Sequence, residues 1–113
     1  MPQQVTDIDI LRDYLQGAMG KADHHALNVN EIALAIAGGV VWRKDDDPIE
    51  VMVREGEMKN VLWFKVDGNR YAISYNHDTK EIEIRQGSTQ GAVMGSFSNS
   101  MTNNQVRQVF ESL

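Results

Sequence analysis

Four side chains capable of chemistry share the spacing of a single helix face. In order along the chain, they are Lys21, His24, Asn28 and Glu31. Their intervals of three and four residues bring side chains to the same side of an α-helix. A histidine on such a face could transfer protons near neutral pH, with a carboxylate to orient it. The simpler interpretation, which we favour, is the solvated face of an amphipathic helix; a partner-binding or catalytic face is the alternative.

The sequence lacks motifs that would require a particular catalytic or metal-binding chemistry. On a helix, His24 and the adjacent His25 would point about 100° apart and could not bind one ion together. The three aspartates at 45–47 lack the alternating ligands of a calcium-binding loop. Residues 87–91 lack the Lys-Ser/Thr ending of a phosphate-binding loop, and the chain has no Cys. We therefore assign no catalytic residue, no metal and no cofactor.

A cavity between a curved sheet and its helices is a second candidate site. The aromatic residues that could line it are Trp42, Trp63, Phe64, Tyr71 and Tyr75. A tyrosine hydroxyl or His25 could orient a small molecule there. Aromatic side chains at alternating strand positions are more often part of the core. The complete set of candidate ligand-binding or partner-binding residues is His24, His25, Asn28, Glu31, Tyr71 and Tyr75.

Two amphipathic helices are predicted at the N-terminus. The first begins at Thr6, whose hydroxyl can cap it. Its apolar stripe consists of Ile8, Leu11 and Leu15. The second begins at Asp23 and ends at the pair Gly38-Gly39. Residues 30–37 also alternate as a strand would, but their alanines favour a helix.

After Gly39 the apolar period changes to two, which predicts an antiparallel meander. The expected strands cover residues 40–42, 49–54, 61–66, 70–75, 81–85 and 92–97. The first would pair with the second, with the acidic segment 43–48 as the hairpin tip. A further turn is expected at 55–60, and Asp67-Gly68 has the composition of a type I′ turn. The meander has five or six strands, depending on whether the first and the last both pair.

The last helix has a capping box in Thr102 and Gln105. Its buried stripe is expected to contain Val106, Val109, Phe110 and Leu113. The predicted fold class is α+β, in a single domain of residues 1–113. An antiparallel β-meander of about five strands is packed on one face by two N-terminal helices and one C-terminal helix. The opposite face of the sheet would carry Arg70, Ser74, Glu81, Glu83 and Arg85.

Charge and hydropathy limit the partners. The 16 acidic and 11 basic side chains give a net charge of −5, which disfavours nucleic acid and matches a basic protein surface. The chain shows neither a signal peptide nor an apolar run of about 18 residues, so no membrane partner is expected and the predicted location is the cytoplasm.

As a short acidic domain of helices and an antiparallel meander, the chain resembles the small proteins encoded on integron gene cassettes, and also bacterial immunity proteins. The resemblance lies in the overall pattern and therefore transfers no functional residue. We expect a small soluble bacterial binding protein without catalysis, which uses its sheet face or acidic loop, or forms a homodimer through the edge strand 92–97. The alternative is a small-molecule-binding protein or small enzyme with a pocket between sheet and helices.

Overall fold

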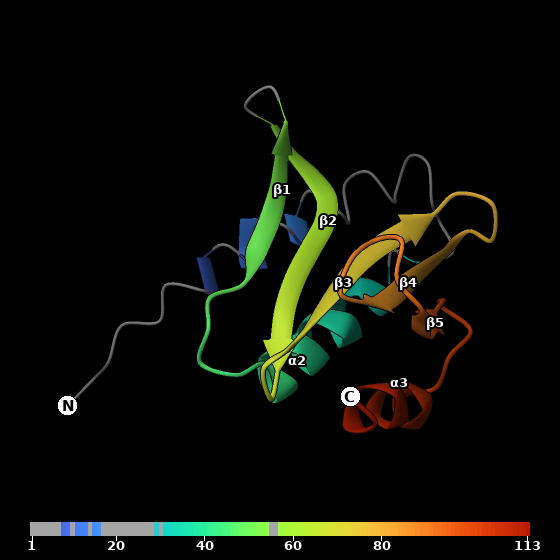
Figure 1. Ribbon diagram of the computed structural model, residues 1–113. Coiled ribbons are helices and arrows are strands. Elements are labelled where there is room, and N and C mark those ends of the chain that lie inside the picture. The colour runs from blue at the N-terminus through green and yellow to red at the C-terminus, as the bar shows by residue number, and fades with distance from the viewer. Residues whose placement is uncertain (1–7, 10, 14, 17–28, 30, 55–56) are drawn as a thin grey trace.

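The computed structural model describes residues 8–9, 11–13, 15–16, 29, 31–54 and 57–113, and it has an α+β fold. Five antiparallel strands form one sheet in the order β1-β2-β3-β4-β5 (Figure 1). The strands are β1 (Glu50–Arg54), β2 (Glu57–Val66), β3 (Asn69–Asn76), β4 (Glu81–Gln86) and β5 (Val93–Phe97). The helices are α2 (Ile32–Arg43) and α3 (Asn103–Glu111). The predicted fold class is confirmed.

The described residues of the predicted first helix are helical. Leu11 is buried and Leu15 is half-buried, as the apolar stripe requires. Ile8, which was expected in the same stripe, is exposed. The proposed caps at Thr6 and Asp23 lie outside the described residues. The second helix was predicted to run from Asp23, but α2 begins at Ile32, and residues 29 and 31 are in turns.

The meander follows the predicted turns from β2 onward. Asp67 and Gly68 both have positive φ, 51° and 82°, as a type I′ turn needs. The turn expected at 55–60 is shorter than predicted, because β2 begins at Glu57 and pairs with β1 from there. The strand expected at 92–97 is β5, which lies at the edge of the sheet and pairs with β4 through an irregular register.

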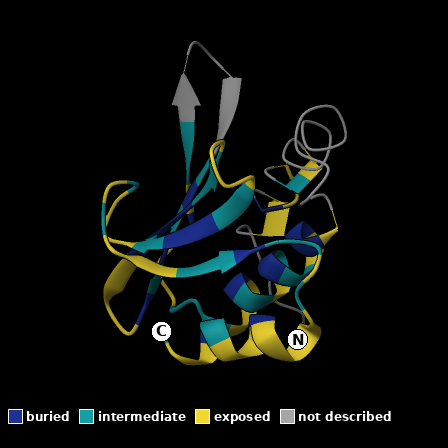
Figure 2. Ribbon diagram, turned by 90° about the vertical axis from the view of Figure 1, so that its right-hand side faces the viewer, coloured by how far each residue is buried: buried dark blue, intermediate teal, exposed yellow. Residues whose placement is uncertain are grey.

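One face of the sheet and the helices enclose the core (Figure 2). Leu62, Ile73 and Ile84 lie opposite one another on β2, β3 and β4 and are buried. From the helices, Ile36, Val40, Val106 and Phe110 belong to the same cluster. The rings of Phe64 and Phe97 lie 6.4 and 5.6 Å from that of Phe110, so α3 is joined to the sheet through aromatic packing.

The prediction that Gly38-Gly39 ends a helix is wrong, since α2 continues to Arg43. The predicted strand 40–42 is therefore the last turn of α2, and the acidic segment links α2 to β1. Gly39 lies against the ring of Phe110, and a Cβ built on Gly39 would be 2.7 Å from Phe110 Cγ. Glycine at this position allows the two helices to approach closely, rather than marking a helix end.

Arg43 completes the contact between the two helices. Its Nε donates to the main-chain oxygen of Phe110 at 3.0 Å, and its Nη2 donates to that of Leu113 at 2.8 Å. The Phe110 oxygen lies in the last turn of α3 and the Leu113 oxygen lies two residues beyond its end. A helix leaves the carbonyls of its last turn without partners within the helix. A cation there also opposes the negative end of the helix dipole.

The start of α2 is capped from a distant loop. Asn99 Oδ1 accepts hydrogen bonds from the main-chain N–H of Glu31 at 3.1 Å and of Ile32 at 2.9 Å. We expect Asn99→Ala to lower the free energy of unfolding by about 1 kcal/mol, as the loss of a helix cap does. Chemical denaturation measures this change. Asn99→Asp is the control, because a carboxylate also accepts both bonds and suits the helix dipole; a loss equal to that of the alanine variant would contradict the capping role.

The α3 capping box is confirmed. Thr102 Oγ1 accepts from the N–H of Gln105 at 3.1 Å, and Gln105 Oε1 accepts from the N–H of Thr102 at 2.9 Å. Val106 and Phe110 are buried, while Val109 and Leu113 are half-buried. This cap fixes where α3 begins and hence which of its side chains face α2.

Candidate functional site: the groove between α2 and α3

Of the six candidate residues, the structure describes Glu31, Tyr71 and Tyr75. His24, His25 and Asn28 lie outside the described residues. Glu31 is exposed at the N-cap position of α2. Tyr71 is buried against Phe64, with 5.9 Å between ring centroids, and Tyr75 is half-buried with its ring edge-on to His77 at 4.9 Å. Within the described chain, no hydrogen bond or ion pair joins Glu31 to either tyrosine.

A void does lie between the sheet and the helices, but it is small and apolar. Its volume is about 30 Å³. The lining residues are Leu11, Leu15, Ala33, Ile36, Ala37, Val40, Leu62, Ile73 and Ile82. Neither candidate tyrosine is among them, and the space corresponds to roughly one water molecule's share of the liquid. This volume is well below the roughly 300–1,000 Å³ of typical ligand pockets.

Several polar side chains of the outer sheet face are paired within the protein. Arg85 donates from Nε and Nη2 to Glu83 Oε1, at 3.2 and 2.9 Å, and Asn76 Nδ2 donates to the same oxygen at 3.3 Å. Glu83 is consequently buried, with 8% of its surface exposed, although it lies on the face expected to be solvated. Further along this face, the Arg70 guanidinium lies 5.0 Å from the centroid of the Trp63 ring. These groups stabilise the sheet surface itself.

The acidic loop is also held by internal contacts. Asp45 accepts hydrogen bonds from the N–H groups of Asp47 and Gly68, at 3.0 and 3.2 Å. Asp47 pairs with Lys65 Nζ at 3.2 Å. The loop thereby ties the end of α2 to the β2–β3 turn. In the described part of the chain, no three His, Asp or Glu side chains are arranged to hold a metal ion.

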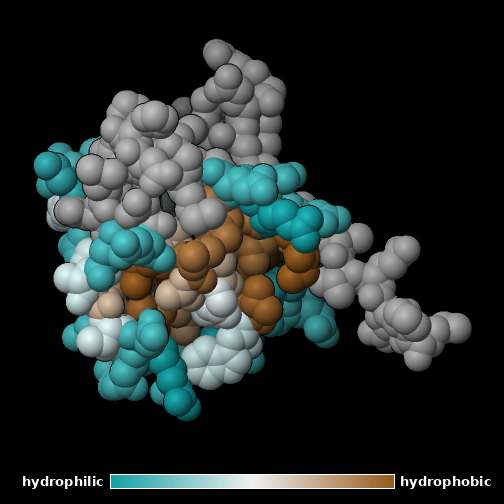
Figure 3. Space-filling view, turned by 180° about the vertical axis from the view of Figure 1, so that it is seen from behind, coloured by the Kyte–Doolittle hydropathy of each residue, from teal (hydrophilic) through white to brown (hydrophobic). Residues whose placement is uncertain are grey.

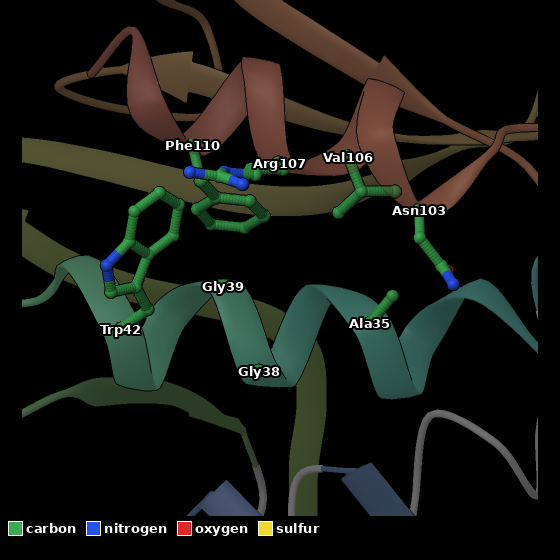
Figure 4. Close-up of a pocket in the computed structure, with 8 residues that line it drawn as sticks. All are labelled: Ala35, Gly38, Gly39, Trp42, Asn103, Val106, Arg107 and Phe110. Carbon is green, nitrogen blue, oxygen red and sulfur yellow. The ribbon is translucent and has the colours of Figure 1, made fainter.

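A hollow with a volume of about 500 Å³ lies between α2 and α3. The two helices run side by side in the same direction (Figure 4). The residues that line the hollow are Ala35, Gly38, Gly39, Trp42, Asn103, Val106, Arg107 and Phe110. Because Gly38 and Gly39 have no side chains, nothing from α2 fills the middle of the groove. We call this feature the α2–α3 groove.

Beside the groove, α2 exposes apolar side chains. Leu34, Val41 and Trp42 have 60%, 51% and 51% of their surface exposed. With Gly38, they occupy the positions i, i+4, i+7 and i+8 of one helix face. Seen from behind, hydrophobic side chains gather in the middle of the side on which the helices lie (Figure 3). A contiguous apolar surface of this kind typically marks an interaction site.

The composition of α2 explains this exposure. The twelve-residue helix has no polar side chain before Arg43. A surface helix normally needs only one apolar face, and a helix that is apolar all round is normally buried on all sides. One face of α2, with Ile32, Ile36 and Val40, covers the sheet. The opposite face has no cover from the described residues.

Sequence reasoning missed this face because it placed residues 40–42 in a strand. The available signal was the uninterrupted apolar run that starts at Ile32 and ends at Trp42. In an extended strand, such a run is typical of a position covered on both faces. In a helix, the same run places apolar side chains on all sides, so some of them lie outside the single face that the sheet buries.

Comparison with known protein families agrees with the overall pattern of the chain. The family model described as "Integron cassette protein VCH_CASS1 chain" matches residues 11–107. The chain belongs to this family of integron cassette proteins. The predicted resemblance to integron cassette proteins is confirmed. A comparison with curated proteins gave no match.

Both described helices of this cassette protein are shorter than a bilayer requires. In the described part of the chain, no helix has the length and apolar content to cross a membrane.

Proposed function

We propose that this integron cassette protein is a non-catalytic binding protein, and that its α2–α3 groove takes the apolar face of an amphipathic helix of a partner protein. The observation that carries the proposal is the exposed face of α2, where Leu34, Val41 and Trp42 stand beside an open groove of about 500 Å³. Helices commonly bind in such grooves through side chains spaced along one face.

The dimensions of the groove suit a helix. Its α2 wall extends from Ala35 to Trp42, which is about two turns, or roughly 10 Å, at the rise of an α-helix. A partner helix with apolar residues at i, i+3 or i+4, and i+7 would cover that length. Gly38 has no neighbour within 4 Å of a built Cβ, so the partner's backbone can approach α2 closely there.

Burial of the exposed apolar surface supplies the driving force. Full burial of a large apolar side chain contributes roughly 1.5–3 kcal/mol, so covering the exposed half of Leu34, Val41 and Trp42 contributes on the order of 1 kcal/mol each. Association also costs translational and rotational freedom. The proposal therefore requires the partner to fill the groove as well as to contact the rim.

Gly38 offers a test that leaves the fold intact. Peptides selected from a display library against the wild-type protein are expected to have helical apolar spacing. Gly38→Gln should weaken their binding at least tenfold, because the new side chain projects into the groove. Gly38→Ala, which adds only a methyl group, should bind within about threefold of wild type. Both substitutions favour the helix, so thermal stability should not fall.

Other occupants would be recognised in the same experiment. Peptides that bind the Gly38→Gln variant as well as wild type would contradict the proposal. A dimer in sedimentation that Gly38→Gln abolishes would instead place a second copy in the groove. A dimer that persists in that variant would favour pairing through the β5 edge, where Val93 and Met94 are exposed. Such a dimer would contradict the proposal if, in addition, no selected peptide bound in the groove.

A further inference from the structure

The groove differs in charge from the protein as a whole. The chain carries a net charge of −5. Among the eight residues that line the groove, however, the charged one is Arg107, and α2 contains no acidic residue. At the far end of α2, Arg43 adds a second positive charge close to Trp42, with its guanidinium 5.7 Å from the centroid of the indole ring. The groove is therefore a locally positive site on an acidic protein.

Arg107 stands apart from the other arginines whose side chains are described. Arg12, Arg70 and Arg85 pair with acidic side chains, at 3.9, 3.7 and 2.9 Å. Arg43 donates to two main-chain oxygens. Arg107 is exposed and makes no ion pair or hydrogen bond in the described part of the chain, although Glu111 follows four residues later on the same helix.

An unpaired guanidinium on an apolar wall favours one class of ligand. A carboxylate that reaches Arg107 would form a charge-assisted hydrogen bond in a place that the partner shields from water. A lysine or arginine at the same position would meet a like charge, which an interface disfavours strongly. Arg107 lies between Asn103 and Phe110 on the α3 wall, so the carboxylate would sit beside the partner's apolar stripe (Figure 4).

We infer that the partner helix is acidic: it presents an Asp or Glu to Arg107 next to the apolar side chains that fill the groove. This inference rests on the proposed function and adds the chemistry of the partner. The net negative charge of the chain favours a basic partner, but the groove lining carries a positive charge and therefore favours an acidic one. The partner class is thus an amphipathic helix with a carboxylate at the edge of its apolar face.

A charge-reversal experiment tests the inference. The probe is a groove-binding peptide from the selection, which should contain an Asp or Glu beside its apolar stripe, together with the same peptide carrying Lys there. We expect Arg107→Glu to weaken the acidic peptide about tenfold or more and to strengthen the Lys peptide, while Arg107→Gln has a smaller effect. Lys80→Glu makes the same change in net charge in the β3–β4 turn, outside the groove lining, and should change binding less than twofold.

The outcomes separate this inference from the proposed function. If Gly38→Gln abolishes binding but Arg107→Glu and Lys80→Glu have equal effects, the groove is used and the acidic partner is overturned. The inference also fails if the selected peptides are basic beside their apolar stripe. If Gly38→Gln has no effect, the proposed function itself is overturned. If the Arg107→Glu variant binds the Lys peptide more tightly than wild type does, both the groove-binding function and the acidic partner are supported.

Discussion

Replacing Phe110 by alanine is expected to lower the free energy of unfolding by about 3–5 kcal/mol, which is the usual effect of removing a buried aromatic side chain. Phe110 is fully buried, with 0% of its surface exposed. Its ring lies among Phe64, Phe97 and Gly39, so it joins α3 both to the sheet and to α2. Urea or guanidinium denaturation followed by circular dichroism measures the change.

The loss of unfolding free energy in Phe110→Ala shows whether α3 is firmly packed against the sheet and α2 or only loosely attached. Small domains have total stabilities of about 5–15 kcal/mol, so the alanine variant should be close to unfolding at 37 °C. Phe110→Leu keeps most of the apolar volume and should lose clearly less. A loss below about 1 kcal/mol for Phe110→Ala would mean that α3 is not packed as described, and the α2–α3 groove would lose its second wall.

Gly39→Ala is expected to destabilise the protein by about 1–3 kcal/mol, even though alanine is the better helix former. The added Cβ would clash with the Phe110 ring, whose Cγ would be 2.7 Å away. The ring cannot move aside easily, because Phe64 and Phe97 pack against it. Thermal and chemical denaturation of the purified variant test this expectation.

The neighbouring glycine is a matched control. A Cβ at Gly38 meets no atom within 4 Å, so Gly38→Ala should stabilise α2 by about 0.5–1 kcal/mol. The two variants carry the same chemical change one residue apart, and we expect their stabilities to differ by about 1.5–4 kcal/mol. Combining Gly39→Ala with Phe110→Leu should cost less than the sum of the two single changes, since the smaller side chain relieves the clash. Equal stability of the two alanine variants would contradict the helix contact.

The sheet from β2 to β5 and the capping box of α3 could be predicted because local signals decide them. Positive φ at Asp67 and Gly68 is a property of the turn itself. The hydrogen bonds between Thr102 and Gln105 likewise involve residues three apart. In the strands, one face is buried, so the register follows from the alternation of apolar and polar residues.

The end of α2 could not be predicted, since a distant residue decides it. Two adjacent glycines usually end a helix, and the apolar run from Ile32 to Trp42 fits a covered strand after Gly39 as well as a longer helix. The deciding contact comes from Phe110, far along the chain. Two further long-range contacts hold α2 in place: Asn99 at its start and the bonds from Arg43 to α3. Tertiary contacts of this kind override local propensity.

The candidate site was missed for the same reason. Once Val40, Val41 and Trp42 were assigned to a strand, their apolar character was explained by the core. The candidates Tyr71 and Tyr75 face the helices and contribute to packing, as aromatic residues on strands generally do. Arg107 could not be recognised as unpaired before the positions of α2 and α3 were known.

Mapping a bound peptide by NMR tests most directly whether the α2–α3 groove is the binding site. Isotope-labelled protein would be titrated with a peptide selected against the wild type, and amide shifts followed residue by residue. We predict that the largest shifts occur at Ala35, Gly38, Trp42 and Arg107. Shifts confined to the outer face of the sheet or to the loop at residues 45–47, with Gly38 unchanged, would contradict the account.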